Sequence, residues 1–368
     1  MDMEDVCIMR KKRISVLLTL SFILAFFLLS AGSLNVKAAT SGDYSLKVGG
    51  SNTDNLNIDN GNYFITGNAG QSVDLKLLVI NSASNTRRFK FSVTTAFTDD
   101  NGALSYNKLK VSDPSLKIQT RGLASPKDAV FSVPGNKTAT LTFSMKVPEQ
   151  KFNGILMGGV TVAPYKEKAK GTVSNNGTLI KNKFSYSIPI QIRQSGNETV
   201  QPSYSIRTVK PGLTNTADGR KQGVQANIHN STNSYAGTLS AHAVVTKKSD
   251  KSFKIVKDGS ADIAPTTNYN MAIPWGKKTL QAGNYHLKVT YKTRGGLKSW
   301  VLNKDFTITN NDAAKYNKLA GVKPNYLWLY ILLGILALAI ILGLGIYLGK
   351  KNNKGNNNSD NSSRKRRR

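Results

Sequence analysis

A long apolar segment near the C-terminal end constrains the fold of this chain more than any other feature. Residues 326–348, YLWLYILLGILALAIILGLGIYL, contain no charged side chain. A bilayer core of about 30 Å needs about 20 apolar residues in a helix, because lipid offers the backbone no hydrogen-bonding partner. A helix buried in a soluble domain usually keeps a polar face, which this segment lacks. The sequence therefore predicts one transmembrane helix at 326–348.

The residues at both ends of this segment are typical of a membrane interface. Amphipathic rings favour the headgroup level, and basic side chains favour the cytoplasmic side. The predicted interface residues are Tyr326, Trp328, Tyr330 and Tyr347, followed by Lys350 and Lys351. A basic tail at 349–368 ends on the sequence RKRRR. Membrane lipid is therefore one expected partner.

The first 38 residues have the pattern of a secretory signal peptide. Basic residues precede an apolar run at 16–29, and Ala38-Ala39 follows as the small-residue cleavage pattern. A first membrane helix is the alternative, but a run this short rarely spans a bilayer. An exported N-terminus and a basic C-terminal tail predict that residues 39–325 lie outside the cell and that the tail lies in the cytoplasm.

The charge of the chain indicates an anionic partner. The formal net charge is +30 at pH 7, and most of it lies between the two apolar runs. Nucleic acid is the usual partner of a basic chain, but an exported segment does not meet it, so we expect no nucleic acid partner. An anionic cell wall is the more natural partner. The one cysteine, Cys7, lies upstream of the first apolar run, so the mature chain would hold no disulfide.

Residues 43–309 predict an all-β fold. Runs in which polar and apolar residues alternate, such as 88–96 and 139–147, are typical of half-buried strands. Turn signals such as Asn101-Gly102 separate these runs. No helical stripe of useful length precedes the membrane segment. We therefore expect two immunoglobulin-like β-sandwich domains in tandem.

Changes in composition give the domain boundaries. A polar Gly/Ser/Asn segment is typical of a linker, and it separates the two groups of strands. The predicted order is a signal peptide at 1–38, a first sandwich at 43–193, a linker at 194–201, a second sandwich at 202–309, a polar stalk at 310–325, the transmembrane helix at 326–348 and the basic tail at 349–368.

The exported part of the chain carries no catalytic or metal-binding motif. Its histidines, His229, His242 and His286, lack zinc-ligand spacing. The acidic DDNG turn at 99–102 lacks the calcium loop with its closing Glu. No nucleophile elbow and no phosphate loop is present. We therefore expect no enzyme activity and no cofactor, although a hydrolase with two facing carboxylates stays open as an alternative.

Binding is the remaining class of function. Aromatic rings can stack on sugars or anchor a protein partner. The candidate binding residues are Phe152, Tyr165, Trp275 and Trp300, and the alternative is that these rings fill the cores or rims of the sandwiches. Residues 321–325 read GVKPN instead of the LPxTG sorting signal, so the helix is expected to stay in the membrane.

The order of segments is similar to that of the WxL-interacting cell-surface proteins of Gram-positive bacteria. In the first domain the resemblance rests on Tyr63-Phe64-Ile65, the turn Ala69-Gly70-Gln71, AFTDDNG at 96–102 and GILMGGV at 154–160. In the second domain it rests on Pro202, the strand and turn at 224–230, AGNY at 282–285, and Trp300 before Phe306. Family members usually carry Pro-Gly-Gln where this chain has Ala69-Gly70-Gln71.

This resemblance implies a peptidoglycan-binding domain followed by a host-binding domain. It also implies WxL-domain surface proteins and host extracellular matrix as partners. We therefore expect a non-enzymatic, single-pass surface protein that displays a complex at the cell wall. Two alternatives stay open, namely a wall-modifying hydrolase and an accessory subunit of a surface complex without direct wall binding.

Overall fold

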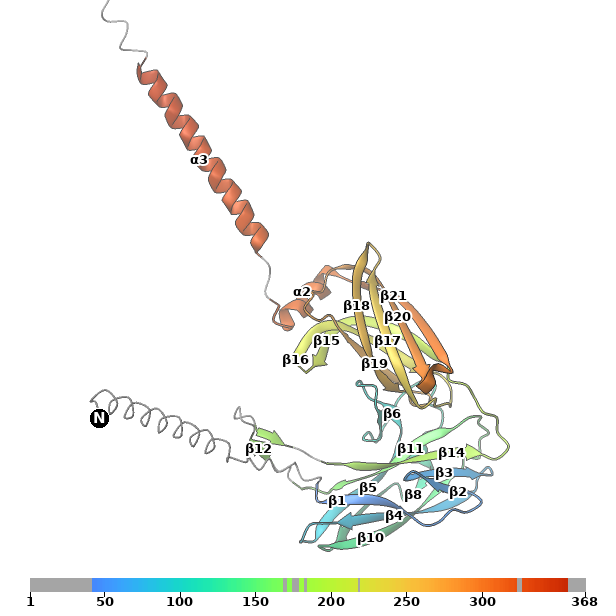
Figure 1. Ribbon diagram of the computed structural model, residues 1–368. Helices are drawn as coiled ribbons and strands as arrows, with labels where there is room; N and C mark the ends of the chain where they lie inside the picture. The colour runs from blue at the N-terminus through green and yellow to red at the C-terminus, as the bar shows by residue number, and fades with distance from the viewer. Residues whose placement is uncertain are drawn as a thin grey trace, which may run out of the picture.

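Two β domains follow one another along the chain, and a long helix stands away from them (Figure 1). This is a computed structural model, which describes residues 42–167, 171–173, 179–181, 184–217, 219–322 and 326–356. The signal peptide predicted at 1–38 and most of the predicted basic tail lie outside the described residues. The arrangement confirms the expected fold class of two β-sandwiches and one C-terminal apolar helix.

The first domain is a sandwich of a four-stranded and a six-stranded sheet. The smaller sheet has the order β1-β4-β10-β8, with β1 (Tyr44–Gly49), β4 (Ser72–Asn81), β10 (Lys137–Lys146) and β8 (Ala124–Ser125). The larger sheet has the order β2-β3-β14-β11-β5-β9, with β2 (Leu56–Asp59), β3 (Asn62–Gly67), β14 (Tyr186–Gln194), β11 (Leu156–Pro164), β5 (Arg87–Thr95) and β9 (Asp128–Val133).

Alternation along the strands produces the core of this domain. In β4 every second residue is buried, so the strand has one apolar face and one polar face. Aromatic rings from facing strands meet between the sheets, and the centroids of Phe91 and Phe143 lie 5.1 Å apart. Among the strand pairs of the larger sheet, β3 and β14 run parallel, with Tyr63 opposite Ile190. This parallel pair brings together two segments that are far apart in the sequence.

Short elements extend from the first sandwich. They are β6 (Phe97–Thr98), β7 (Leu104–Ser105), the 3₁₀ turn η1 (Thr120–Leu123), β12 (Gly171–Val173) and β13 (Leu179–Lys181). The ring of Tyr106 packs on β11 at Gly159, where an added Cβ would lie 2.6 Å from the ring. The hydroxyl of Thr161 donates to the Tyr106 carbonyl at 3.1 Å. The segment 106–119 is therefore held at its start on the outer face of the larger sheet.

The second domain is a sandwich of a three-stranded and a four-stranded sheet. The first sheet has the order β15-β16-β19, with β15 (Tyr204–Thr216), β16 (Gly219–Asn230) and β19 (Asn268–Pro274). The other has the order β18-β17-β20-β21, with β18 (Asp250–Asp262), β17 (Thr238–Lys247), β20 (Gly283–Thr293) and β21 (Ser299–Ile308). The 3₁₀ turn η2 (Arg294–Gly296) joins β20 to β21.

A short helix, α2 (Asn310–Leu319), follows β21 and corrects the expectation that no helix precedes the membrane segment. Thr309 caps this helix, because its hydroxyl accepts from the Asp312 amide at 3.1 Å while the Asp312 carboxylate accepts from the Thr309 amide at 3.4 Å. The side chain of Asn317 bonds both backbone groups of Leu280, at 2.9 Å each. Part of the predicted stalk thus packs on the second domain.

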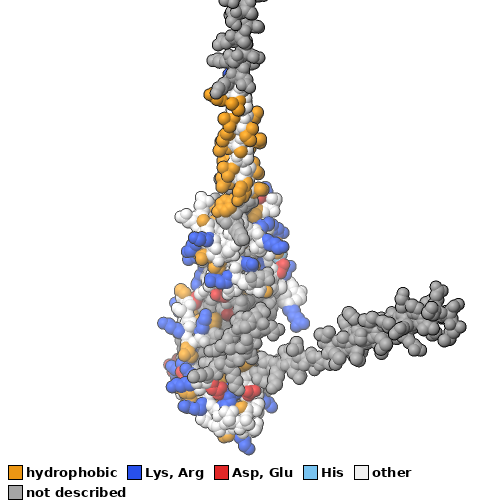
Figure 2. Space-filling model, turned by 90° about the vertical axis from the view of Figure 1, so that its left-hand side faces the viewer, with side chains coloured by type: hydrophobic (Ala, Val, Ile, Leu, Met, Phe, Trp, Pro, Cys, Tyr) orange, Lys and Arg blue, Asp and Glu red, His pale blue; other side chains and the backbone are white. Residues whose placement is uncertain are grey.

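The last described helix, α3 (Leu327–Asn356), contains the predicted membrane segment except for its first residue, Tyr326. Its window Leu329–Leu348 has a mean hydropathy of 2.8, and none of it is buried against the rest of the described chain. Hydrophobic side chains cover the helix where it leaves the domains (Figure 2). In length and composition this helix is suited to cross a membrane.

Candidate functional site

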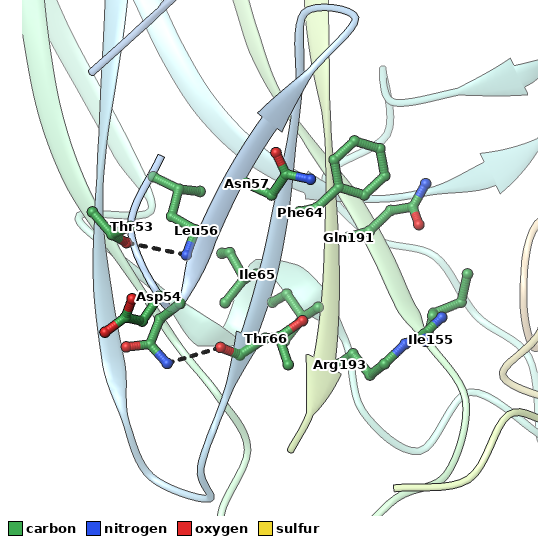
Figure 3. A pocket seen from close by; sticks show the side chains of 12 residues that line it. Thr53, Asp54, Leu56, Asn57, Phe64, Ile65, Thr66, Ile155, Gln191 and Arg193 are labelled. Carbon is green, nitrogen blue, oxygen red and sulfur yellow. Dashed lines mark hydrogen bonds between the residues drawn. The ribbon is translucent and has the colours of Figure 1, made fainter. Parts of the chain in front are cut away.

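A pocket of about 310 Å³ opens on the first domain, at the edge of the larger sheet (Figure 3). Its walls come from β2 and the loop before it, from β3, from β14 and from Ile155. In β3, Phe64 and Thr66 alternate with the core residues Tyr63 and Ile65. Period-two alternation therefore turns Phe64 and Thr66 to the outer face of the sheet.

Strand register sets the outward side chains of the pocket in two rows. Asn57 on β2 lies opposite Phe64 on β3, and Phe64 lies opposite Gln191 on β14. In the second row, Thr66 lies opposite Arg193. The parallel pairing of β3 with β14 makes these rows, because it aligns residues that share one face.

Some polar groups in the pocket are already used by the fold. Asn55 donates to the Thr66 carbonyl at 3.0 Å and accepts from the side chain of Gln71 at 2.8 Å. By contrast, the side chains of Asn57, Gln191 and Arg193 make no hydrogen bond with the described residues. These amide and guanidinium groups remain available to a ligand.

The chemistry of the pocket combines one aromatic ring with several neutral polar groups. Phe64 is half-buried and presents its ring between Asn57 and Gln191 (Figure 3). A ring of this kind can cover an apolar face of a ligand, while amides on both sides of it give and accept hydrogen bonds. Sugars bear both kinds of group, so the arrangement is suited to a carbohydrate.

The four rings predicted from the sequence do not come together. Trp275 is only 1% exposed and packs against Phe253 and Tyr285, and Phe152 is buried in the first core. Buried rings offer no face to a ligand, so these two belong to the cores. That was the alternative reading of the sequence, and it corrects their assignment as binding residues.

The other two predicted rings are half-buried at separate places. Tyr165 lies under the guanidinium of Arg88, with 5.0 Å between guanidinium and ring centre. Trp300 packs edge-on against Tyr204, with ring centres 5.2 Å apart. Neither ring lines the pocket on β3 and β14.

Sequence reasoning missed the residues that do line this pocket. Alternation in the runs around Phe64 and around Gln191 was a usable signal, since it places both on an outward face. The missing information was the pairing of β3 with β14, because alternation along a strand does not indicate which other strand it pairs with.

The predicted membrane-interface residues lie on α3 and beside it. Tyr326 precedes the helix, Tyr330 is near its start and Tyr347 is near the end of the apolar window, and all three are exposed. Lys350 is also exposed and lies just past that window. The side chains of Trp328 and Lys351 lie outside the part of the chain that the structure describes.

A buried carboxylate joins the two domains. Asp113 belongs to the segment 106–119 of the first domain, and its side chain has 0% exposure. Its two oxygens accept from the guanidinium of Arg207 at 2.8 and 3.1 Å and from the amide of Asn268 at 2.5 Å, both residues of the second domain. Ser115 adds a bond from its hydroxyl at 2.6 Å.

This network changes the pKa of two groups. Burial alone would raise the pKa of Asp113, but the hydrogen bonds from Arg207, Ser115 and Asn268 outweigh it and hold the pKa well below the usual value. His229, whose Nε2 lies 3.0 Å from the Ser115 hydroxyl, has a lowered pKa. Burial is its main cause, and the positive charge of Arg207 adds to it against the attraction of Asp113.

The hairpin of β6 and β7 makes a second contact between the domains. Figure 1 shows β6 between them. The carbonyl of Gly102, at the hairpin tip, accepts from the Asp262 amide at 2.7 Å, at the end of β18. The Asp100 carboxylate accepts from the Asn270 amide on β19 at 3.1 Å. The hairpin thus bonds the outer edges of both sheets of the second sandwich.

Apolar side chains fill the space beside these bonds. Tyr106, Ile155 and Met157 from the first domain form one buried cluster with Ala264 from the second. Across the part of the chain that the structure describes, no group of three or more His, Cys, Asp or Glu residues could hold a metal ion. At the junction, the apolar cluster packs beside the hydrogen bonds made by Asp113 and by the hairpin.

Comparison with known protein families gives two matches. The sequence profile described as WxL Interacting Protein, peptidoglycan binding domain, matches residues 50–164. The profile described as WxL Interacting Protein, host binding domain, matches residues 175–318. The second match begins before β14, although β14 is a strand of the first sandwich. No curated protein sequence matches the chain.

Solved structures of fimbrial chaperones are weakly similar to this chain. The E. coli chaperone DraB is 13% identical, and the alignment covers 72% of this chain and 96% of that one, with a TM-score of 0.28. A chain from the complex of the Salmonella enterica SafA pilin with the SafB chaperone is 12% identical over 71% of this chain and 96% of that one, with a TM-score of 0.27. TM-scores this low do not indicate a shared function.

Proposed function

Because the chain belongs to the WxL-interacting protein family, with a peptidoglycan-binding domain before a host-binding domain, we propose that it is a non-enzymatic cell-surface protein that binds the wall through the pocket on β3 and β14. The observation that carries this proposal is the row formed by Asn57, Phe64 and Gln191. It sets an aromatic ring between two amides that the fold leaves free.

The net charge supports the same function in a different way. Most of the formal charge of +30 lies between the two apolar runs, on the segment that we place outside the cell, and this favours accumulation at an anionic wall. Charge of this kind raises the rate of encounter and the local concentration, while selectivity comes from specific contacts. In this proposal the basic surface brings the protein to the wall, and the pocket selects the ligand.

The apolar helix α3 supports the proposed location. We place α3 in the cell membrane, the two sandwiches outside the cell and the basic tail in the cytoplasm, because basic segments stay on the cytoplasmic side. Membrane lipid then surrounds the exposed apolar side chains of α3, which the rest of the described chain leaves uncovered.

A pull-down with purified peptidoglycan tests the wall-binding role. We expect the double variant Asn57→Ala and Gln191→Ala to lose at least tenfold in affinity for the wall, because both free amides are removed. The control is Gln225→Ala, which removes an exposed amide on the second domain. Equal retention of both variants would contradict the pocket as the wall site.

The same incubation separates binding from hydrolysis. We expect peptidoglycan to be recovered without released muropeptides, since the matched domains are described as binding domains. Release of soluble fragments would support the wall-modifying hydrolase instead. Recovery of partner proteins from a surface extract without any retention on purified wall would support an accessory subunit.

The second domain offers a candidate site for protein partners. A cavity of about 640 Å³ lies along β18 and β19 next to the hairpin tip at Gly102. The backbone bond between Gly102 and Asp262 supports this site, because a segment from outside the sheet already pairs there with the end of β18. We propose that WxL-domain proteins or host matrix proteins dock there, with Lys257 as the exposed cation of the cavity.

Charge reversal tests this docking site. We expect Lys257→Glu to weaken recovery of the partner several-fold. The matched control is Lys251→Glu, which changes the same charge on the same strand outside the cavity. If both variants recover the partner equally well, the cavity is not the docking site.

A further inference from the structure

A second pocket lies on the other side of the loop that bounds the first one. It has a volume of about 350 Å³, and its walls come from the end of β1, from the loop before β2 and from the start of β4. The two pockets share three wall residues, Thr53, Asn55 and Leu56. They are therefore neighbours on two sides of one segment, at residues 50–56.

The segment between the pockets is held in place by its own hydrogen bonds. The side chain of Asn52 accepts from the Ile58 amide at 2.7 Å. Thr53 and Leu56 exchange backbone bonds at 2.8 and 3.3 Å. Asn55 ties the segment to β3 and to Gln71. A ligand that reaches both pockets thus crosses a preformed ridge, and binding does not have to order it first.

Each pocket is small for a ligand site. Volumes of about 310 and 350 Å³ lie near the lower end of the range of about 300–1,000 Å³ found for ligand pockets. Neither pocket alone holds more than a short piece of a polymer. A chain that continues from one pocket to the other would roughly double the contact, which favours a polymer over a single small molecule.

The charges along this path exclude a strongly charged polymer. The ionisable side chains of the two pockets are Asp54, Asp74, Lys76 and Arg193, two of each sign. Asp74 also accepts from the Ser144 hydroxyl at 2.7 Å. An anionic polymer is bound by clustered cations, which are not present on this path. The remaining polar groups are mainly amides and hydroxyls, which match a neutral chain.

From these features we propose that the two pockets form one binding path for the glycan strand of peptidoglycan, with the ridge at residues 50–56 between successive sugars. The glycan backbone supplies hydroxyl and acetamido groups for the amides, and apolar ring faces for Phe64. The peptide stems and the anionic wall polymers stay outside the path. This inference rests on the proposed wall binding, and it adds which part of the wall is recognised and over what length.

Titration of the full-length protein in detergent with peptide-free glycan fragments tests the path. With fragments of two, four and six sugars, we expect affinity to rise at least tenfold from the shortest to the longest. Affinity that does not change with length would overturn the path. Stronger binding of free stem peptides or of teichoic acid than of the six-sugar fragment would overturn the assignment to glycan.

A variant that fills one pocket gives a second, independent measurement. Ser51 is exposed and lines only the second pocket, so Ser51→Trp should block that pocket and remove the gain in affinity with fragment length. Ser45→Trp, on an exposed position of β1, is the matched control and should keep the gain. A gain that survives Ser51→Trp would contradict the inference.

The two proposals fail in different ways. If the protein does not bind intact peptidoglycan at all, the proposed function is wrong. If intact peptidoglycan is bound but glycan fragments show no dependence on length, only the shared path is wrong and the wall is held by other contacts.

Discussion

At the scale of single residues, Asp113 is a buried side chain that bonds the two domains together. It comes from the first domain, yet Arg207 and Asn268 of the second domain supply three of its hydrogen bonds. A carboxylate with no exposed surface is stable only when such donors surround it. Removing it leaves those donors without an acceptor in a buried place.

We expect Asp113→Ala to destabilise the protein by about 3 kcal/mol. Breaking a buried ion pair costs about 3–5 kcal/mol, and the lower end applies because the Arg207 side chain keeps 33% of its surface. Denaturant unfolding of the second domain measures the loss. Asp305→Ala, which removes a carboxylate that is 57% exposed, is the control and should change stability far less, because solvent screens exposed ion pairs.

Acid should weaken the same network in two steps. The pKa of His229 is lowered in the fold, so the unfolded chain binds the proton more readily and stability falls as pH decreases below about 6.5. The pKa of Asp113 is also lowered, so its contribution is present above about pH 4 and is lost as pH falls further.

Unfolding free energy measured from pH 8 to pH 3 checks this expectation. His229→Gln should remove the first step and leave the second, because glutamine does not titrate. A first step that persists in this variant would mean that another group causes it.

At the scale of elements, the hairpin of β6 and β7 requires glycine at its tip. Gly102 has a φ of +85°, and an added Cβ would lie 2.8 Å from the Ser260 carbonyl oxygen of the second domain. Gly237 has a similar φ of +76° but no described atom within 4 Å of such a Cβ. The two glycines thus separate backbone strain from a clash between domains.

We expect Gly102→Ala to cost clearly more stability than Gly237→Ala. The change at Gly237 measures the left-handed backbone alone, about 1–2 kcal/mol. The change at Gly102 adds the clash and disturbs the Asp262 bond, so the Asp262 amide should also exchange faster with solvent. Equal costs would mean that the hairpin can move without loss.

One side chain of helix α2, that of Asn317, adds hydrogen bonds to the packing that attaches the helix to the second domain. The side chain of Asn317 bonds both the amide and the carbonyl of Leu280, as the backbone of a neighbouring strand would do. We expect Asn317→Ala to cost about 1–3 kcal/mol, because two backbone groups lose their partner. Hydrogen exchange at Leu280 measures it, and Asn311→Ala, at an exposed position of the same helix, should leave that amide unchanged.

The sequence was informative about single strands and much less so about their neighbours. The alternating runs at 88–96 and 139–147 correspond to β5 and β10 within a few residues. Alternation cannot indicate that β3 pairs with β14, and the pocket exists only through that pairing. Helix α2 was not predicted because Ala313 is its one buried residue, so its sequence lacks the periodic apolar positions that indicate an amphipathic helix.

At the scale of the whole molecule, the two sandwiches and their junction form one connected structure. A buried carboxylate, a hairpin and an apolar cluster join the domains at separate places. The order of domains and the apolar helix could be predicted from the sequence, because periodicity and length are local properties. The junction could not be predicted, because nothing in the sequence around Asp113 and Arg207 indicates that the two residues pair.

The net positive charge of the segment between the two apolar runs predicts how wall binding responds to salt. Raising NaCl from 0.1 to 1 M shortens the Debye length from about 10 to about 3 Å, so long-range attraction to an anionic wall is lost. We expect retention on intact wall to fall several-fold. Binding of neutral glycan fragments should stay nearly constant under the same conditions. Undiminished retention on the wall at high salt would mean that charge plays little part.

The place of the pocket on β14 has a mechanical consequence. For a protein held by the wall at this pocket and by the membrane at α3, tension enters the chain at β14 and passes through residues 195–203 directly into β15. Strand β14 is bonded along both sides, to β3 and to β11. Pulling along the strand loads these bonds together in shear. The part of the load that enters at β14 is therefore resisted by both neighbouring strands before it reaches the second domain.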